Sequence, residues 1–283
     1  MGIIIAVLLF SFIIIFHELG HFLLAKKNGI RVDEFSLGLG PTLLGKQIGE
    51  TKFSLKLLPF GGACMMGEDD ADDLSEGSFN SKSVWARMSV VAAGPIFNLI
   101  LACVFCFILI MITGYRSPEI TGVLDGYSAQ EEGLQAGDVI TEINGRNVHI
   151  WDDVSLYTMT HADEAPFKVE YERDGKKYTA KLEPRQLEGD AAPLLGVTSG
   201  DIVKPGIFKS VEYSIYKVKY WMNYTVDSLR MLVTGQAGLK DLSGPVGIVN
   251  AVDDMYQEAA PAGFGVVMLS MMNFGVLLTT NLG

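Results

Sequence analysis

Three long stretches of this 283-residue chain contain almost no charged side chains, and this feature restricts its fold more than any other. Residues 1–25 carry one acid, Glu18, and no base, while residues 88–115 and 259–283 carry neither. Each stretch exceeds the roughly 20 apolar residues that an α-helix needs to cross a bilayer. The sequence therefore predicts three hydrophobic spans.

The first stretch is expected to stay in the mature protein rather than to act as a signal peptide. It lacks a basic n-region and a small-residue cleavage site, and His17, Glu18 and His21 interrupt it. With 49% hydrophobic and 19% charged residues, the chain is too apolar for a disordered protein. We predict a polytopic α-helical membrane protein.

Charge sets the expected orientation of these spans. Eight Lys and Arg residues lie between the first and second spans, a segment that the positive-inside rule places in the cytoplasm. The N-terminus and residues 115–200 are then outside. Residues 115–200 contain 16 acidic and 8 basic side chains and are expected to form a separate soluble domain. The net charge of −11 argues against nucleic acid as a partner.

Between the first two spans, residues 32–41 and 51–68 alternate apolar and polar side chains and are interrupted by Gly and Pro. This pattern favours hairpin strands on the cytoplasmic side. The acidic residues 68–77 that follow are expected to form a solvated loop.

Residues 205–234 predict an amphipathic helix, because Tyr213, Tyr216, Tyr220 and Tyr224 recur at helical spacing beside charged residues. Tyrosine favours the headgroup level of a bilayer, so this helix can lie at the outer surface of the membrane. Packing against the soluble domain would explain the same pattern. The sequence leaves both interpretations open.

The motif FHELGHF, residues 16–22, brings ionisable groups into the first span. His17 and His21 are four residues apart, so they lie on one face of a helix, about 6 Å apart along its axis, and can reach a single ion. In this arrangement neutral histidines bind Zn²⁺, while Glu18 takes a proton from water and passes it to the leaving amine. Each ionisable group at membrane depth costs at least about 2.5 kcal/mol on insertion scales, so chance is the poorer explanation.

The other histidines and the cysteines have simpler explanations. His149 and His161 fall in the soluble domain, where we expect surface positions. Cys103 and Cys106 lie in the second span and are expected to be packing residues. With Cys64 they make an odd set, which indicates no disulfide framework.

Several motifs, in the same order along the chain, resemble the site-2 proteases, a family of intramembrane zinc metalloproteases, and within it the bacterial regulator of sigma-E protease type. FHELGHF resembles the catalytic helix, and LKLLPFGGACMMGED (55–69) resembles the membrane-reentrant β-hairpin. AAGPIFN (92–98) resembles the start of the second span, and LSGPVGIV (242–249) the segment ahead of the third. The resemblance implies zinc as cofactor, His17 and His21 as its ligands, and Glu18 as the catalytic glutamate.

Within the soluble domain, residues 133–148 (GLQAGDVITEINGRNV) resemble a strand-and-turn stretch of a PDZ domain. Gly137 and Gly145 mark tight turns around a short buried strand at 139–143. PDZ domains bind a peptide as an added strand at a sheet edge, sometimes through its C-terminal carboxylate. Peptide binding and simple exclusion of large substrates by bulk both stay open.

The expected fold is therefore a polytopic α-helical membrane protein with an inserted mainly-β PDZ-like domain and a membrane-associated β-hairpin, in the bacterial cytoplasmic membrane. Its expected parts are the first span 1–26, the cytoplasmic-side hairpin and loop 27–87, the second span 88–114, the extracytoplasmic PDZ-like domain 115–200, the interfacial amphipathic helix 205–234 and an incomplete third span 259–283.

One departure from the family pattern concerns the third zinc ligand, an aspartate in a Leu-Asp-Gly motif of the third span, which this sequence lacks. The chain ends in NLG (281–283), which resembles the residues before that motif, so we expect a C-terminally truncated chain whose ligand lies beyond Gly283. Asp253 and Asp254 precede the span and are poor substitutes. With two histidines alone zinc is under-coordinated, so this polypeptide is expected to bind metal weakly and to be inactive.

The resemblance implies cleavage within a transmembrane helix of another protein, such as an anti-sigma-factor-like protein or a remnant signal peptide. A helix hides its carbonyl groups, so cleavage requires local unwinding. The hairpin around Phe60, Gly61 and Gly62 can hold the unwound segment as an added strand, or it can only pack the helices. Asn98 can donate to a developing oxyanion, orient a zinc ligand or join two helices.

Two other functions stay open. The chain can be a membrane-tethered PDZ binding module with an inactive metal site, which the absent aspartate favours and the retained Glu18 opposes. It can also be a metal transporter, which would need ligands on several spans, whereas only the first span carries them.

Overall fold

The computed structural model describes residues 2–67, 73–187, 193–238 and 245–283. The chain divides into two compact units. One consists of Met1–Phe105 with Lys240–Gly283, and the other is Cys106–Leu239.

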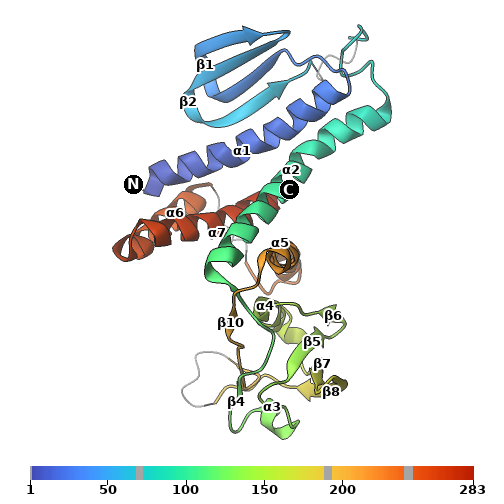
Figure 1. Cartoon of the computed structure of the whole chain (residues 1–283), viewed down its shortest axis with the longest axis vertical. Coiled ribbons are helices and arrows are strands. Elements are labelled where there is room, and N and C mark those ends of the chain that lie inside the picture. Colours follow the sequence, from blue (N-terminus) through green and yellow to red (C-terminus); the bar gives the residue numbers. More distant parts are fainter. Residues whose placement is uncertain (1, 68–72, 188–192, 239–244) are drawn as a thin grey trace. The chain divides into compact units, whose positions relative to one another are not determined.

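The first unit is built on helices that are long and apolar enough to cross a membrane (Figure 1). They are α1 (Gly2–Lys27), the first part of α2 (Val84–Thr113), and α7 (Phe264–Leu282). At 1.5 Å per residue, the 26 residues of α1 extend about 39 Å, more than the hydrocarbon core of a bilayer. A shorter helix, α6 (Pro245–Ala259), and a 3-10 turn, η3 (Ala260–Ala262), precede α7.

Two features of these helices differ from the expectation. α2 begins at Val84 and not at residue 88, because the Oγ of Ser83 accepts a hydrogen bond from the N–H of Ala86 and starts the helix there. α6 was not predicted as an element. The motif at 242–249 runs into it, and residues 242–244 of this motif lie outside the described residues. Val252 of α6 is buried in one cluster with Ala6 of α1, which ties α6 to the first span.

The segment between α1 and α2 forms a sheet from two long strands, β1 (Glu34–Ile48) and β2 (Thr51–Met65), which pair antiparallel. β1 continues past Pro41, where the sequence predicted an end. Each strand bends back on the other, so Leu37 has both Leu55 and Gly62 as partners, and Leu55 also pairs with Leu44. Four strand segments therefore lie side by side, with 34–39 and 51–58 in the middle.

The second unit holds a four-stranded sheet in the order β6-β5-β7-β8. The strand predicted at 139–143 is its β5, and Gly137 and Gly145 on either side have φ of +94° and +86°, as tight turns require. Ile140, Ile143 and Phe167 are buried in its core. The strands are β5 (Val139–Ile143), β6 (Arg146–Asn147), β7 (Phe167–Arg173) and β8 (Lys176–Leu182).

Smaller elements surround this sheet. Two-stranded pairs join β3 (Tyr115–Arg116) to β10 (Ile202–Val203), and β4 (Gly122–Val123) to β9 (Val197–Thr198). Helices α3 (Ser128–Glu131) and α4 (Trp151–Thr160) and the 3-10 helix η1 (Ala162–Glu164) complete the β-rich part of the unit.

The last helix of the second unit, α5 (Ile207–Val233), packs its aromatic face on the β-rich part. Tyr213 stacks on Tyr115 with ring centroids 3.7 Å apart, and Tyr216 stacks on His149 at 3.9 Å. The opposite face of α5 is aliphatic and exposed. Its residues are Ile207, Val211, Ile215, Met222, Val226, Leu229 and Val233.

Both histidines of this unit are more buried than the surface positions expected for them. His161 is 5% exposed, lies with Nε2 3.7 Å from the carboxylate of Asp227, and stacks on Tyr157. His149 is partly covered by Tyr216. The expectation was wrong because α5, distant in sequence, covers this side of the domain.

Candidate metal centre

The two histidines of α1 present their rings on the same side of the helix. The ring centroids of His17 and His21 are 4.8 Å apart and their planes are inclined by 76°. The helix is continuous through both residues, so the four-residue spacing places one ring a turn above the other. This part of the predicted geometry is present in the structure.

A backbone carbonyl on α2 fixes the tautomer of His21. Nδ1 of His21 lies 2.7 Å from the carbonyl oxygen of Val90. A carbonyl oxygen can only accept, so Nδ1 carries the proton and donates it. The neutral ring then has an unprotonated Nε2, whose lone pair is available to a metal.

A buried amide on α2 holds the other histidine. Asn98 is 0% exposed and places Nδ2 3.0 Å from Nδ1 of His17. In this orientation Nδ2 donates to Nδ1, and Oδ1 of Asn98 has no hydrogen-bond partner among the described residues. Rotating the Asn98 amide by 180° exchanges Oδ1 and Nδ2. Nδ1 of His17 can then donate a hydrogen bond to Oδ1 of Asn98. That arrangement satisfies the buried oxygen and leaves Nε2 of His17 unprotonated, as in His21.

Two glycines allow α1 and α2 to approach each other at this level. A Cβ on Gly20 would lie less than 3.0 Å from the carbonyl oxygen of Ala93. A Cβ on Gly94 would lie less than 3.0 Å from Nε2 of both His17 and His21. The two nitrogens therefore converge on the space that the missing side chain of Gly94 leaves. Neutral imidazole nitrogens are ligands that Zn²⁺ prefers, so the residues present fit a metal with two histidine ligands.

Glu18 lies beside the sheet. A Cβ on Gly62 of β2 would be 3.6 Å from Cγ of Glu18 and 3.9 Å from Ile14. Gly61 has a φ of +85°, and a Cβ there would contact Leu39 instead. The side chain of Phe60 lies outside the described residues. Of the two predicted hairpin glycines, Gly62 is therefore the one that the structure brings to the glutamate.

A third protein ligand is not found in the described part of the chain, where no group of three His, Cys, Asp or Glu side chains is arranged to hold a metal ion. Asp253 of α6 lies at the other end of α1, because a Cβ on Gly2 would meet its carboxylate. Gly2 and His17 are fifteen positions apart, which corresponds to about 22 Å of helix. Asp253 is therefore too distant to complete the histidine pair.

The end of α7 reaches the same turn of α2 that faces the histidines. A Cβ on Gly283 would lie 3.1 Å from the carbonyl oxygen of Pro95 and 3.1 Å from Cγ of Leu99. Pro95 follows Gly94 directly. Three helices, α1, α2 and α7, thus meet around the candidate metal centre.

Two parts of the centre were not predicted. Val90 acts through its backbone carbonyl, which every residue possesses, so no side-chain pattern could have identified it. Gly94 was noted only as part of a family motif. Small residues are typical of close helix contacts, and the sequence has Ala93 and Gly94 side by side in α2 and Gly20 in α1. This pattern could have indicated the approach of the two helices.

Comparison with known proteins gives a consistent set of relatives. The sequence profile of peptidase family M50 matches residues 5–282. A Clostridium acetobutylicum protein named as a zinc metalloprotease is 37% identical over 282 residues, which cover 100% of this chain and 80% of the relative. The regulator of sigma-W protease RasP from Bacillus subtilis is 28% identical, over 98% of this chain and 83% of its own length. A solved PDZ domain of an SdrC-like protein from Listeria monocytogenes aligns with 30% of this chain and 88% of its own, at 24% identity and a TM-score of 0.25.

Proposed function

Because this chain belongs to peptidase family M50, we propose that it is a site-2-type zinc metalloprotease that cleaves a peptide bond in the membrane-embedded segment of another protein. The observation that carries this proposal is the convergence of Nε2 of His17 and His21 on the space beside Gly94. The substrates would be anti-sigma-factor-like membrane proteins or remnant signal peptides. The name of the Bacillus subtilis relative, a regulator of sigma-W protease, supports the first class.

His17 and His21 would hold the zinc ion. Zinc, when bound, would act as a Lewis acid toward the scissile carbonyl and lower the pKa of water. The chain's own contribution is orientation, because Val90 and Asn98 direct both Nε2 lone pairs to one point. The described residues supply these two histidines and no group of three His, Cys, Asp or Glu side chains arranged to hold a metal ion.

Glu18 would act first as general base and then as general acid. It would take a proton from the attacking water and give it to the nitrogen of the leaving amine, which departs neutral. Its position supports this role, since it follows His17 directly and lies next to Gly62 of the sheet. A peptide lying between the sheet and α1 would pass within reach of its carboxylate.

Asn98 would orient His17 and could also serve the reaction. With the amide turned so that Oδ1 accepts from Nδ1 of His17, the two N–H bonds of Nδ2 are released. They could donate to the oxyanion that develops on the scissile carbonyl. The burial of Asn98 between two helices also allows a purely structural role, in which the amide only joins α1 and α2.

The sheet would hold the unwound substrate as an added strand. Among the four strand segments of the sheet, residues 62–65 lie at one end, next to 34–37. A peptide joining this edge would run past Gly62 and therefore past Glu18. Backbone hydrogen bonds would then stabilise the extended form that cleavage requires.

The β-rich part of the second unit would act as a PDZ-like peptide-binding module. A cavity of about 560 Å³ lies between α4 and β9, lined by Trp151, Val154 and Val197 among others. The carbonyls of Gly196 and Thr198 accept hydrogen bonds from the N–H groups of Leu124 and Thr121, which flank β4. Because successive residues of a strand direct their backbone groups to opposite sides, the N–H and C=O of Val197 point toward the cavity. The backbone at the end of an apolar peptide could form hydrogen bonds with them there.

The exposed aliphatic face of α5 supports an interfacial position for this helix. Ser210 Oγ lies 3.1 Å from Met111 Sδ, so α5 starts beside the end of the hydrophobic helix α2. The β-rich part would then lie outside the membrane, with the sheet of β1 and β2 on the cytoplasmic side of a multi-pass protein in the bacterial cytoplasmic membrane. The distribution of Lys and Arg supports this orientation.

The test uses the full-length protein, purified in detergent, loaded with zinc and incubated with a transmembrane reporter. Wild type should cleave it, and Glu18→Gln should retain zinc but lose cleavage. Glu50→Gln, which alters an exposed acid of the hairpin turn, should cleave like wild type. Equal turnover by Glu18→Gln would remove Glu18 from the mechanism. Absence of both zinc and cleavage in the wild type would favour a membrane-tethered binding module with an inactive metal site.

A further inference from the structure

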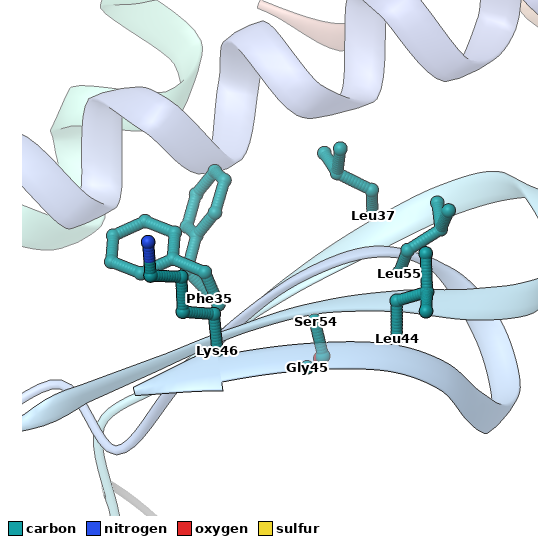
Figure 2. Close-up of a pocket in the computed structure, with 8 residues that line it drawn as sticks. Phe35, Leu37, Leu44, Gly45, Lys46, Ser54 and Leu55 are labelled. Atoms are coloured by element: carbon teal, nitrogen blue, oxygen red, sulfur yellow. The ribbon is translucent and has the colours of Figure 1, made fainter. Parts of the chain in front are cut away.

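The face of the sheet that is turned to α1 carries an apolar groove of about 340 Å³ (Figure 2). Its apolar lining comes from Phe35, Leu37, Leu44, Phe53 and Leu55. Figure 2 shows Leu37, Leu44 and Leu55 pointing to the same side of the sheet. No step proposed above uses this groove.

The strand register connects the groove to Glu18. Leu37 is paired with Gly62 on one side and with Leu55 on the other, and Leu55 is paired with Leu44. Directly opposed residues of a sheet have their side chains on the same face. Gly62, Leu37, Leu55 and Leu44 therefore form one row across the sheet, the leucine row, which begins at the glycine beside Glu18.

The dimensions of the leucine row suit a substrate side chain. Adjacent strands lie about 4.8 Å apart, so the row extends about 14 Å from Gly62 to Leu44. Exposure rises along it, from 36% at Leu37 to 41% at Leu55 and 69% at Leu44. The row is therefore most covered next to α1 and opens away from it.

A second row closes one end of the groove. Phe35 and Phe53 are paired with each other, and both pack on Phe22 of α1. The ring centroid of Phe22 lies 5.3 Å from that of Phe35 and 5.7 Å from that of Phe53. Phe22 lies one turn after Glu18. The aromatic contact holds the sheet against α1 on that side, while the leucine row has no equivalent aromatic contact with α1 among the described residues.

We propose that the leucine row is a specificity subsite that receives a large apolar side chain, such as Leu or Phe, from the unwound segment of a transmembrane substrate. This inference rests on the proposed function. A peptide residue that pairs opposite Gly62 would direct its side chain to the face that carries Leu37. Gly62 has no side chain to block that path. Burial of an apolar side chain against the three leucines would favour substrates with Leu or Phe at that position over those with Ala or Asp.

The test measures cleavage by the full-length, zinc-loaded protein of reporters that differ at one position, scanned in turn along the segment next to the scissile bond. At one position, wild type should cleave the Leu and Phe reporters about tenfold faster than the Ala reporter, and the Asp reporter slowest. Leu55→Trp, which fills the groove, should slow the Leu and Phe reporters and spare the Ala reporter. Leu43→Trp is the matched control, because Leu43 is a 56% exposed neighbour outside the groove lining and should leave the preference unchanged.

If Leu55→Trp slows the cleavage of all reporters equally, or leaves the preference for Leu and Phe over Ala unchanged, the leucine row is not a subsite. Either result would favour a groove filled only by lipid. Cleavage of no reporter by wild type would overturn the proposed function and the subsite with it, which distinguishes the two failures. A second measurement does not depend on the tryptophan variant folding. A photo-crosslinking amino acid at position 44 in the Glu18→Gln protein should attach to the reporter, while the same group at position 43 should not.

Discussion

The side-chain amide of Asn98 lies 3.0 Å from Nδ1 of His17, so a residue of α2 controls which nitrogen of a histidine on α1 can bind a metal. His21 is held in the same way by the carbonyl of Val90. One partner is a side chain and the other is backbone. Only the first can be removed by substitution, so the importance of orientation can be measured at Asn98.

Asn98→Ala in the full-length protein should weaken zinc binding about 10- to 100-fold, the usual effect of losing a group that orients a histidine ligand. Without an acceptor opposite Nδ1, the tautomer with a free Nε2 is no longer favoured and the ring can rotate. Zinc retention against increasing chelator concentration measures the effect. Asn98→Asp keeps an acceptor and should retain most of the affinity. Wild-type zinc binding in Asn98→Ala would mean that the amide only packs the two helices.

Gly94→Ala should abolish zinc binding at metal concentrations that saturate the wild type. The added methyl group would occupy the point where Nε2 of His17 and His21 converge. Helix propensity works in the opposite direction, since Ala is favoured over Gly by about 1 kcal/mol in a helix, so the helix itself should not be weakened. Gly265→Ala in α7 is the control, because nothing lies within 4 Å of its added Cβ. Zinc binding by Gly94→Ala equal to that of the control would mean that the metal lies elsewhere.

The sequence predicted the parts of this protein whose signal is local. Nearly uncharged runs long enough to cross a bilayer predicted the three described helices that are apolar enough to span it, α1, α2 and α7. The four-residue spacing of His17 and His21 predicted that their rings share one face of a helix. The buried strand at 139–143 followed from its apolar residues and flanking glycines. In each case, residues within one element determine the outcome.

Features that depend on contacts between distant segments were not predictable in the same way. The doubled pairing of Leu37, with Leu55 and with Gly62, depends on how β1 and β2 bend back on each other. The burial of His161 depends on Asp227, 66 residues later in the chain. The tyrosines of α5 were assigned a helix correctly, but only the packed unit reveals that they contact Tyr115 and His149.

Arg146→Ala should loosen α5 in the second unit. Arg146 donates hydrogen bonds of 2.6 and 2.9 Å to the carboxylate of Asp227, which is 1% exposed. Removing the cation leaves a buried charge without its main partner, which typically costs about 3–5 kcal/mol. Hydrogen exchange of the α5 amides in the full-length protein would report this loss as reduced protection.

Arg185→Ala is the matched control for that experiment. Arg185 also pairs with a carboxylate, that of Glu131, but both side chains are exposed enough for solvent to screen the pair. Pairs of this kind contribute about 0–1 kcal/mol, so α5 should keep its protection. If Arg146→Ala and Arg185→Ala affect exchange equally, the buried pair does not fasten α5.

The contact between His149 and Tyr216 should make the docking of α5 sensitive to pH. Burial and the charge of nearby Lys219 lower the pKa of His149 below its ordinary value of 6.5. The unfolded or undocked state therefore binds a proton more readily than the docked state. The stability that this contact contributes is complete above about pH 6.5 and declines as the pH falls toward the lower, docked-state pKa.

Hydrogen exchange of the α5 amides, corrected for the intrinsic effect of pH, should therefore show less protection at about pH 5 than at about pH 7.5. His149→Phe keeps a ring that can stack on Tyr216 but cannot be protonated, so its protection should no longer fall as the pH is lowered across this range. Asp153 also contacts this segment, through the N–H of His149, but burial raises its pKa, so its protonation would stabilise the docked state as the pH falls. Identical pH profiles for wild type and His149→Phe would assign the sensitivity to another group.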